Sequence, residues 1–390
     1  MDKKFIKDFL SKFDDNPFSI KFWDGEEFLI GTGTPLFNVT FNKPISNTAM
    51  LTSTSLALGE AYMKKDLDID GDLFFALDSI LRYKDEFHTN FFLLHKIFSK
   101  AGSMKKQKDE VSSHYDLGND FYSLWLDKTL SYSCGYFKNE NDSLYDAQMN
   151  TIHHILKKLH LKEGMTLLDI GCGFGHLLIE AAKTYKVNGV GITLSEEQYK
   201  EFKKKIENEN LCQFIDVKLM DYRELSKSEL KFDRVVSVGM LEHVGREHYD
   251  LFMENVNAVL KPKGVFLLHY ISSLVESPGD AWIKKYIFPG GVIPSLREII
   301  SIFTDYNFYT VDVESLRRHY TKTLLCWLEN FNKNKDQISE MFDESFIRMW
   351  ELYLASCAAC FNSGVVDLHQ ILITKGINND LPMTRTYMYK

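Results

Sequence analysis

Hydrophobic and polar positions change their periodicity twice along the chain. Apolar residues between positions 5 and 13 recur at helical spacing, with Lys and Asp between them, so we expect a helix packed on its own domain rather than on a membrane. Alternating runs at 19–22 and 36–41, punctuated by turn signals such as Asp24-Gly25, predict short strands. Helical patterns follow over 56–62 and 73–83. The pattern therefore predicts a small α+β domain over residues 1–90.

After residue 150, short apolar runs alternate with helical patterns. Runs typical of buried strands lie at 165–170, 187–194, 214–220, 233–240 and 264–271, with helical patterns over 177–185 and 248–260. Ser195, followed three residues later by Gln198, predicts a helix start with a capping box. Strands that alternate with helices indicate a parallel, doubly wound sheet covered on both faces. The expected fold class is α/β.

Length and composition narrow the classes of protein that fit. A chain of 390 residues is longer than one hydrophobic core usually serves, so we expect two domains. No apolar run approaches the ~18 residues of a membrane span, and the first residues lack a signal-peptide pattern. Six scattered Cys fit the cytoplasm, where disulfides are rare. A net charge of −8 and a pI of ≈ 5.9 argue against a nucleic-acid partner.

Residues 91–113 read as a basic linker. Five Lys and no acidic residue lie between positions 91 and 108, beside bulky apolar residues. This composition is expected of a solvated linker and equally of a stretch that lies on an anionic lipid surface. The sequence leaves both interpretations open.

The strongest local signal is an acid followed by three glycines at a strand-to-helix junction. Asp169 precedes Gly171, Gly173 and Gly175 at alternating positions. Glycines let a ligand approach the backbone, and ligands of open α/β sheets bind at the carboxyl ends of the strands. An acid two positions before the first glycine suits a cationic ligand without phosphate better than a pyrophosphate. The pattern resembles motif I of class I S-adenosylmethionine methyltransferases, so we expect Asp169, Gly171 and Gly173 to bind S-adenosylmethionine.

The end of the second predicted strand departs from the usual methyltransferase pattern. Methyltransferases usually carry an acid there for the ribose hydroxyls, whereas this chain offers the hydroxyls of Thr193 and Ser195, with Gln198 one turn later. Asp221, after the third strand, either accepts a hydrogen bond from the adenine amine or shapes a turn, and the sequence does not separate these alternatives. The missing acid indicates a subgroup of the methyltransferases.

Further stretches name that subgroup. They lie at residues 59–63, 70–72, 114–122, 132–136, 193–195, 221–223, 239–245, 285–291 and 357–361. Together they look like the cyclopropane-fatty-acyl-phospholipid synthase family of bacteria. The resemblance implies a catalytic domain over 114–390 with a class I methyltransferase fold, joined by the basic linker 91–113 to a sterol-carrier-like lipid-binding domain over 1–90.

The resemblance also implies an activity and a location. The family transfers a methylene from S-adenosylmethionine to cis double bonds of membrane phospholipid acyl chains. A homodimer attached peripherally to the inner face of the membrane is expected. Rival interpretations are methylation of another lipid on the same scaffold, and a non-enzymatic lipid carrier.

By the same resemblance, a bound bicarbonate ion serves as general base. Its implied holders are Cys134, Glu242, His269, the backbone of Ile271, and Tyr320. Taken singly, Cys134 and Tyr320 read as packing residues, Glu242 as a surface acid and His269 as a core histidine. The family context favours the functional interpretation for the set.

The remaining candidates rest on weaker signals. The resemblance adds Tyr132, Ser133 and Tyr222 to the cofactor residues. Cys357 and Cys360 form an isolated C-x-x-C within an apolar helical run, so we expect packing and no metal site. Cys357 is kept as a catalytic candidate, although the chemistry needs no covalent enzyme intermediate.

The basic segment gives a testable prediction. Replacing Lys105, Lys106 and Lys108 by Gln should weaken co-sedimentation with anionic vesicles, because each basic residue near an anionic surface contributes on the order of 1 kcal/mol. Added salt should weaken binding of the parent protein in the same way. Affinity for S-adenosylhomocysteine should stay unchanged. Unaltered vesicle binding would show that the segment is only a linker.

Overall fold

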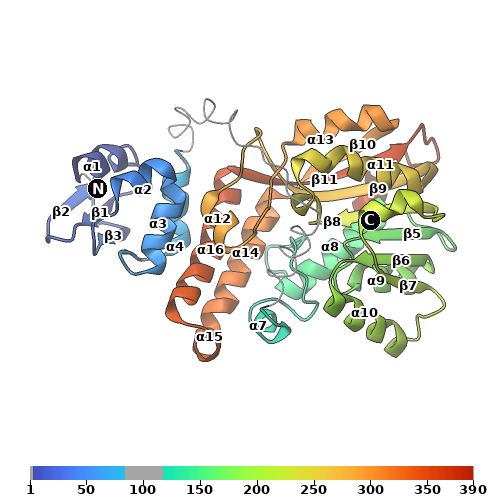
Figure 1. The fold of residues 1–390 in the computed structure, drawn as a ribbon, viewed down its shortest axis with the longest axis horizontal. Coiled ribbons are helices and arrows are strands. Elements are labelled where there is room, and N and C mark those ends of the chain that lie inside the picture. The colour runs from blue at the N-terminus through green and yellow to red at the C-terminus, as the bar shows by residue number, and fades with distance from the viewer. Residues whose placement is uncertain (1–2, 84–116, 390) are drawn as a thin grey trace.

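The computed structural model describes residues 3–83 and 117–389, which form two domains with separate sheets (Figure 1). The N-terminal domain consists of α1 (Lys3–Leu10), β1 (Phe18–Lys21), β2 (Glu27–Ile30), β3 (Phe37–Phe41), α2 (Asn47–Thr52), α3 (Thr54–Met63), β4 (Leu67–Asp70) and α4 (Leu73–Leu81). Its strand order is β2-β1-β3-β4. Ile6 and Leu10 of α1 are buried in the same apolar cluster as β1 and β3, which confirms that this helix packs on its own domain.

The larger domain is built on a seven-stranded sheet in the order β10-β11-β9-β8-β5-β6-β7. Its strands are β5 (Thr166–Ile170), β6 (Asn188–Thr193), β7 (Ile215–Leu219), β8 (Phe232–Val238), β9 (Leu260–Ser273), β10 (Phe308–Ser315) and β11 (Val366–Lys375). The five strands from β5 to β9 pair in parallel, as the alternation of strands and helices predicts. The α/β fold class is confirmed.

Helices cover both faces of this sheet. One face carries α8 (Leu144–Lys158), α9 (His176–Tyr185), α10 (Glu196–Asn208) and the terminal α17 (Thr386–Tyr389), and the other carries α11 (Tyr249–Val259) and α13 (Leu296–Phe303). The short elements are α7 (Asn119–Ser123), η2 (Tyr222–Lys227), η3 (Leu241–His243), η4 (Arg246–His248), α12 (Ala281–Tyr286) and η5 (Thr304–Tyr306). Each face buries its own apolar cluster, so the doubly wound arrangement is also confirmed.

Strand β11 departs from the parallel arrangement and was not among the predicted strands. This strand runs antiparallel to both of its neighbours, β9 and β10. The cause is the helical excursion formed by α14 (Arg317–Lys333), α15 (Lys335–Met341) and α16 (Glu344–Ser363). It leaves the sheet at the end of β10 and returns to the same edge, where Ser315 pairs with His369, so β11 must run back. The excursion therefore lies at the carboxyl ends of the parallel strands.

The predicted capping box at the start of α10 is only half formed. The Ser195 hydroxyl accepts from the backbone N–H of Gln198, as expected. The Ser195 N–H, however, donates to the Thr193 hydroxyl, which in turn donates to the Gln198 side chain. Thr193 thus replaces the reciprocal bond, and the Gln198 side chain is drawn towards the end of β6.

The N-terminal domain docks on α16, which Figure 1 shows between the two sheets. The Arg348 guanidinium donates to the Tyr62 carbonyl at 2.6 Å and pairs with Asp68 at 2.6 Å. Gly59 of α3 packs so closely on Trp282 that a Cβ there would lie 2.4 Å from the indole. The predicted basic linker, residues 91–113, lies outside the described residues. Within the described parts of the chain, no helix is long and apolar enough to span a membrane.

Candidate active site

A cavity of ≈ 300 Å³ lies at the carboxyl ends of β5, β6 and β8. Eight of the nine predicted cofactor residues line it: Tyr132, Ser133, Asp169, Gly171, Gly173, Thr193, Gln198 and Tyr222. Asp221 is the exception. The structure therefore brings together residues that are up to 90 positions apart in the sequence, at the edge of the sheet where open α/β folds bind ligands.

The glycines of the loop after β5 have different roles. Gly171 and Gly173 adopt positive φ values of +82° and +53°, which favour glycine. No protein atom lies within 4 Å of the position that a Cβ on Gly173 would take, and Gly173 lines the cavity. A Cβ on Gly175 would instead lie 2.0 Å from the Phe202 ring. Gly173 thus leaves space for a ligand, whereas Gly175 makes room for α10.

Asp169 is a buried carboxyl with no ion-pair partner among the described residues. It is 3% exposed, and burial raises its pKa to about 7. A buried carboxylate is stabilised by an opposite charge nearby. A ligand that brings an ammonium group to this end of the cavity would supply that charge.

The end of the cavity beside β6 contains a carboxylate that sequence reasoning missed. Glu197, in the first turn of α10, lines the cavity beside Gln198. Gln198 is oriented by the Thr193 hydroxyl, which donates to Oε1 at 2.8 Å. An acid is therefore present, one turn beyond the strand end where methyltransferases usually place it. The Glu196-Glu197 pair after the N-cap Ser195 was the available signal.

The contacts of Asp221 lie within the turn that it begins. Its carboxylate caps η2 by accepting from the backbone N–H of Arg223 at 2.9 Å, and it pairs with the Arg223 guanidinium. Met220, Tyr222 and Arg223 line the cavity instead. The observed contacts are those of the turn-forming alternative, and a hydrogen bond to adenine stays a prediction.

Helix α8 holds the loop that closes the cavity. Gln148 donates to the Ser133 carbonyl at 2.8 Å, and the Thr151 hydroxyl donates to the Cys134 carbonyl at 2.9 Å. Both also line the cavity, together with His243. Sequence patterns did not indicate Gln148 and Thr151, because their partners lie on a segment without regular structure.

Glu242 and His269 present two buried polar atoms where β8 and β9 diverge. Strand pairing between β8 and β9 ends at His269. The next backbone donor of β9 on that side, the Ile271 N–H, therefore donates to Glu242 Oε1 at 2.7 Å. Glu242 Oε2 and His269 Nε2 are buried and have no hydrogen-bond partner among the described residues. The structure thus joins two of the five predicted ion holders, Glu242 and the Ile271 backbone, by a hydrogen bond, and His269 lies two residues before Ile271 on β9.

Burial sets the protonation of this pair. It raises the pKa of Glu242 to about 7 and lowers the pKa of His269 to about 3. Near neutral pH, the carboxyl is therefore protonated in a large fraction of molecules and the imidazole is neutral. Both side chains are then able to donate a hydrogen bond from an uncharged group, which suits an anion in a desolvated site.

The cysteines and Tyr320 lie in apolar surroundings. Cys134 is fully buried, its Sγ lies 3.3 Å from the Gly135 carbonyl oxygen, and burial raises the pKa of its thiol. Burial also raises the pKa of Cys357 on α16. A raised pKa keeps both thiols protonated, so neither is an activated nucleophile. The Tyr320 ring packs against the Phe361 ring, with 4.6 Å between the ring centroids.

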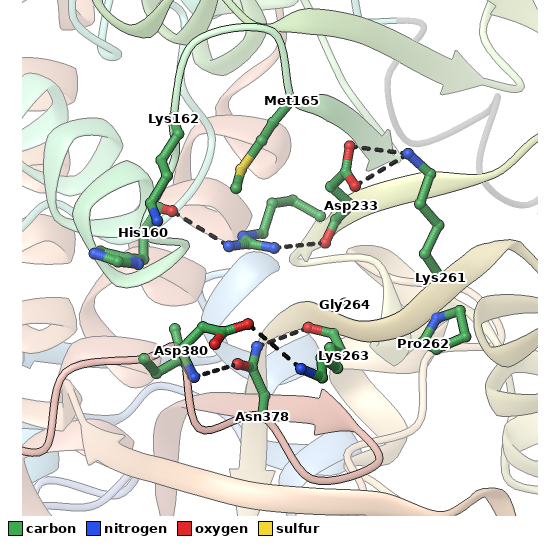
Figure 2. A pocket seen from close by; sticks show the side chains of 12 residues that line it. His160, Lys162, Met165, Asp233, Lys261, Pro262, Lys263, Gly264, Asn378 and Asp380 are labelled. Carbon is green, nitrogen blue, oxygen red and sulfur yellow. Dashed lines mark hydrogen bonds and ion pairs between the residues drawn. The ribbon is translucent and has the colours of Figure 1, made fainter.

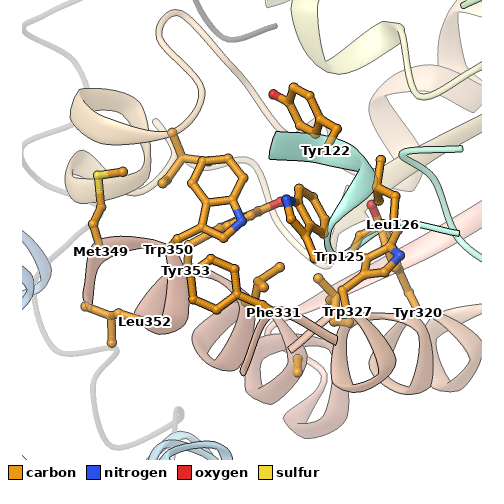
Figure 3. Packing of buried hydrophobic residues seen from close by; sticks show 14 of the residues in the cluster. Tyr122, Trp125, Leu126, Tyr320, Trp327, Phe331, Met349, Trp350, Leu352 and Tyr353 are labelled. Atoms are coloured by element: carbon orange, nitrogen blue, oxygen red, sulfur yellow. The ribbon is translucent and has the colours of Figure 1, made fainter. Parts of the chain in front are cut away.

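Buried aromatic residues of and near α7, α14 and α16 pack into one cluster (Figure 3). This aromatic cluster adjoins the cofactor cavity, because Tyr122 and Tyr132 belong to both. Trp125 lies 5.6 Å from Trp327, between ring centroids, and Tyr132 lies within 5.4 Å of both. The Tyr132 hydroxyl is also 2.7 Å from that of Tyr353. Because Tyr132 lines the cavity and joins the cluster, aromatic faces begin where the cofactor cavity ends.

A second cavity, of ≈ 210 Å³, lies at the opposite ends of β5 and β8 (Figure 2). Several of its charged groups are paired within the protein. Lys261 lies 3.0 Å from both Asp233 oxygens, and the Arg234 guanidinium donates to the Leu159 carbonyl. It contains none of the predicted site residues and takes no part in the site described above.

Solved structures place the fold in a known class. The cyclopropane synthase MmaA2 from Mycobacterium tuberculosis aligns with a TM-score of 0.65 and 33% identity, covering 69% of this chain and 98% of that one. The mycolic acid cyclopropane synthase CmaA1, solved in complex with SAH and CTAB, aligns with a TM-score of 0.64 and 35% identity, covering 69% of this chain and 98% of that one. Coclaurine N-methyltransferase, at 21% identity and a TM-score of 0.63, is similar to this chain in fold only. The larger domain is a class I S-adenosylmethionine-dependent methyltransferase fold, as predicted.

Sequence relatives identify the family. Residues 102–371 match the mycolic acid cyclopropane synthetase family, and residues 5–91 match a domain of unknown function. The cyclopropane-fatty-acyl-phospholipid synthase of Escherichia coli K12 is 38% identical over 350 residues, covering 86% of this chain and 87% of that protein. A probable fatty acid methyltransferase of Pseudomonas putida is 35% identical, covering 96% of each. The chain belongs to the mycolic acid cyclopropane synthetase family, and the predicted resemblance is confirmed.

The glycine loop gives a direct test of the cofactor site. Gly173→Val places a branched side chain in the space that the structure leaves for a ligand, so calorimetric titration with S-adenosylhomocysteine should show binding lost. Gly164→Val is a matched control, because Gly164 is exposed, has a φ of +77° and also has no atom within 4 Å of a Cβ. The control should lose stability but keep affinity. Unchanged affinity in Gly173→Val would place the cofactor elsewhere.

Asp169 predicts how affinity depends on pH. The α-ammonium of S-adenosylhomocysteine favours the ionised carboxylate, so binding should release a proton from a group whose free pKa is about 7. Affinity should therefore rise with pH from about 6 to about 8, by at most roughly tenfold per unit. Asp169→Asn should lower affinity and flatten the profile. The same slope in parent and variant would assign the titration to another group.

Proposed function

We propose that this protein transfers a methylene group from S-adenosylmethionine to a cis double bond of a membrane phospholipid acyl chain, forming a cyclopropane ring. One observation carries the proposal: the cofactor cavity adjoins an aromatic cluster. Two buried atoms without a hydrogen-bond partner among the described residues, Glu242 Oε2 and His269 Nε2, support it. The name of the Escherichia coli relative supports the acyl-phospholipid substrate.

The chemistry explains why such an enclosed site is needed. The alkene attacks the sulfonium methyl, so a carbon–carbon bond forms and the sulfur–carbon bond breaks, which releases S-adenosylhomocysteine. The acyl chain then carries a cation next to the new methyl group. Removal of a proton from that methyl leaves the electron pair that closes the ring. Water would trap the cation, so it must be excluded until the proton has left.

The reaction thus needs stabilisation of the cation, exclusion of water and a base. The aromatic cluster supplies the first two. The faces of Tyr132, Trp125 and Trp327 stabilise a cation through their quadrupoles. Trp125 and Trp327 are fully buried, and the α14–α16 excursion covers this end of the sheet. The same residues thus offer cation stabilisation and exclusion of water.

The third condition is a base, and the buried pair fits the bicarbonate ion that the resemblance implies. Glu242 and His269 are uncharged at neutral pH and present two buried atoms without a partner, so they would hold a small anion by donated hydrogen bonds. Bound there, bicarbonate would supply an anionic base for the methyl proton. The Ile271 N–H orients Glu242, while Cys134 and Tyr320 would complete the enclosure.

The remaining features of the proposal concern the lipid. The N-terminal domain would help to capture phospholipid, and the basic segment would attach the protein peripherally to the inner face of the membrane. A homodimer is part of the same proposal by family resemblance. The docking of α3 and α4 on α16 supports a coupling between lipid capture and the catalytic domain, because α16 also carries part of the aromatic cluster.

A second candidate is methylation of a fatty acid without ring closure. The name of the Pseudomonas putida relative, which covers 96% of this chain, favours it. Mass spectrometry of lipids from bacteria that express this chain separates the two proposals from a non-enzymatic carrier. Cyclopropanation adds one CH₂ and removes one double bond, as hydrogenolysis of the ring would confirm. No change in the lipids would favour the carrier.

Replacing Glu242 tests the proposed base. Glu242→Gln keeps the size and the acceptor for the Ile271 N–H but cannot exchange a proton, so turnover should fall by a factor of about a hundred or more. Affinity for S-adenosylhomocysteine should stay nearly constant. Bicarbonate-depleted buffer at fixed pH should slow the parent enzyme, and the variant should respond much less.

The exposed Glu247, in the next short helix, provides the matched control. Glu247→Gln should leave turnover and the bicarbonate response at the parent level. Full activity of Glu242→Gln would exclude this carboxyl from proton removal.

A further inference from the structure

Gln370 of β11 lies directly opposite His269 of β9 in the antiparallel register. Both residues are buried, with exposures of 0% and 1%. Directly opposed residues of an antiparallel pair point to the same face of the sheet and touch each other. The antiparallel pairing of β11 with β9 therefore places the Gln370 amide beside the His269 imidazole.

The contact between the two side chains defines a tautomer. Gln370 Nε2 lies 3.1 Å from His269 Nδ1. An amide nitrogen has no lone pair to offer, so it donates, and Nδ1 must be the acceptor. In a neutral imidazole the proton then resides on Nε2, the buried atom that has no partner among the described residues.

We propose that Gln370 is a positioning residue that holds His269 as its neutral, Nε2-protonated tautomer, so that the buried Nε2–H is available to donate to an anion. The identity of the anion rests on the proposed function, whereas the tautomer does not. Partners on the outer nitrogen of a functional histidine commonly set its tautomer and orientation in this way.

The charged groups around His269 favour the neutral form. Lys158 and His154 face it from α8, Glu314 faces it from β10, and Glu242 approaches the same strand from η3. Burial is the main cause of the lowered pKa of His269, the positive charge of Lys158 adds to it, and Glu314 opposes it. Glu314 is already paired with Lys158 at 2.5 Å and with His154 at 2.7 Å. His269 is thus left without a free carboxylate partner that would make it a cation.

The tautomer matters because it decides the sign of the interaction. With the proton on Nε2, His269 donates to an anion. With the proton on Nδ1, the Nε2 lone pair would face the anion and repel it. A side chain that donates to Nδ1 therefore supports anion binding, and one that accepts from Nδ1 opposes it.

Two variants separate these roles. Gln370→Glu replaces the donor by a carboxylate that accepts from Nδ1, so Nδ1 should gain a proton and His269 should no longer be the neutral, Nε2-protonated tautomer. Gln370→Met keeps the volume and removes the hydrogen bond, so the tautomer preference should weaken while the packing persists. Gln337→Glu on the exposed face of α15 is the control for the added charge.

The decisive measurement is nuclear magnetic resonance of ring-¹⁵N-labelled histidine in the full-length protein, with the His269 signal assigned by its loss in His269→Asn. In the parent, the protonated nitrogen should be Nε2. In Gln370→Glu, Nδ1 should carry a proton, and kcat should fall at least tenfold while affinity for S-adenosylhomocysteine stays within twofold. In Gln370→Met, half-saturation by bicarbonate should rise. The control should match the parent in each measurement.

The outcomes separate this inference from the proposed function. A parent His269 protonated on Nδ1, or an unchanged tautomer and kcat in Gln370→Glu, would overturn it. If Gln370→Glu fails to bind S-adenosylhomocysteine, the decision passes to Gln370→Met, and a parent-like tautomer there would overturn the inference. A parent enzyme without bicarbonate dependence but with the predicted tautomer shift would overturn the ion and leave the role of Gln370 standing.

Discussion

The hydrogen bond from the Ile271 N–H to Glu242 links the sheet to the chemistry of the site. Where β8 leaves β9, a backbone donor would be left buried without a partner, at a cost of about 1–3 kcal/mol. Glu242 satisfies that donor with one oxygen, and this fixes the direction of the other. A carboxyl is thus held in the interior by the secondary structure itself. Its raised pKa follows from that enclosure.

The helices beyond β10 enclose the site that contains Glu242. The α14–α16 excursion covers the carboxyl ends of the strands and contributes the aromatic cluster, and its return path makes β11 antiparallel. That reversal is also what sets Gln370 opposite His269. On its outer side, α16 receives the N-terminal domain through Arg348 and Asp68. Fold, enclosure and domain docking therefore depend on the same helices.

The sequence predicted much of this architecture because local signals were strong. The acid and glycines after β5 follow from the chemistry of a close backbone approach, and eight of the nine predicted cofactor residues line one cavity. The antiparallel β11 was beyond local patterning, since its direction is set by the α14–α16 excursion, which spans residues 317–363. The roles of Gln148 and Gln370 were equally hidden, because each depends on a partner brought close only by the fold. Glu197 was visible as a helix-start acid, but its place in the cavity was not.

Ring closure is the central claim, and the fate of the methyl hydrogens tests it most directly. The protein, given phospholipid vesicles with unsaturated chains and S-adenosylmethionine deuterated at all three methyl positions, should form a lipid that retains two deuterons, because the third leaves as the ring closes. Mass spectrometry of the released fatty acid would detect this. A product that retains all three deuterons would show methylation without ring closure and would contradict the account.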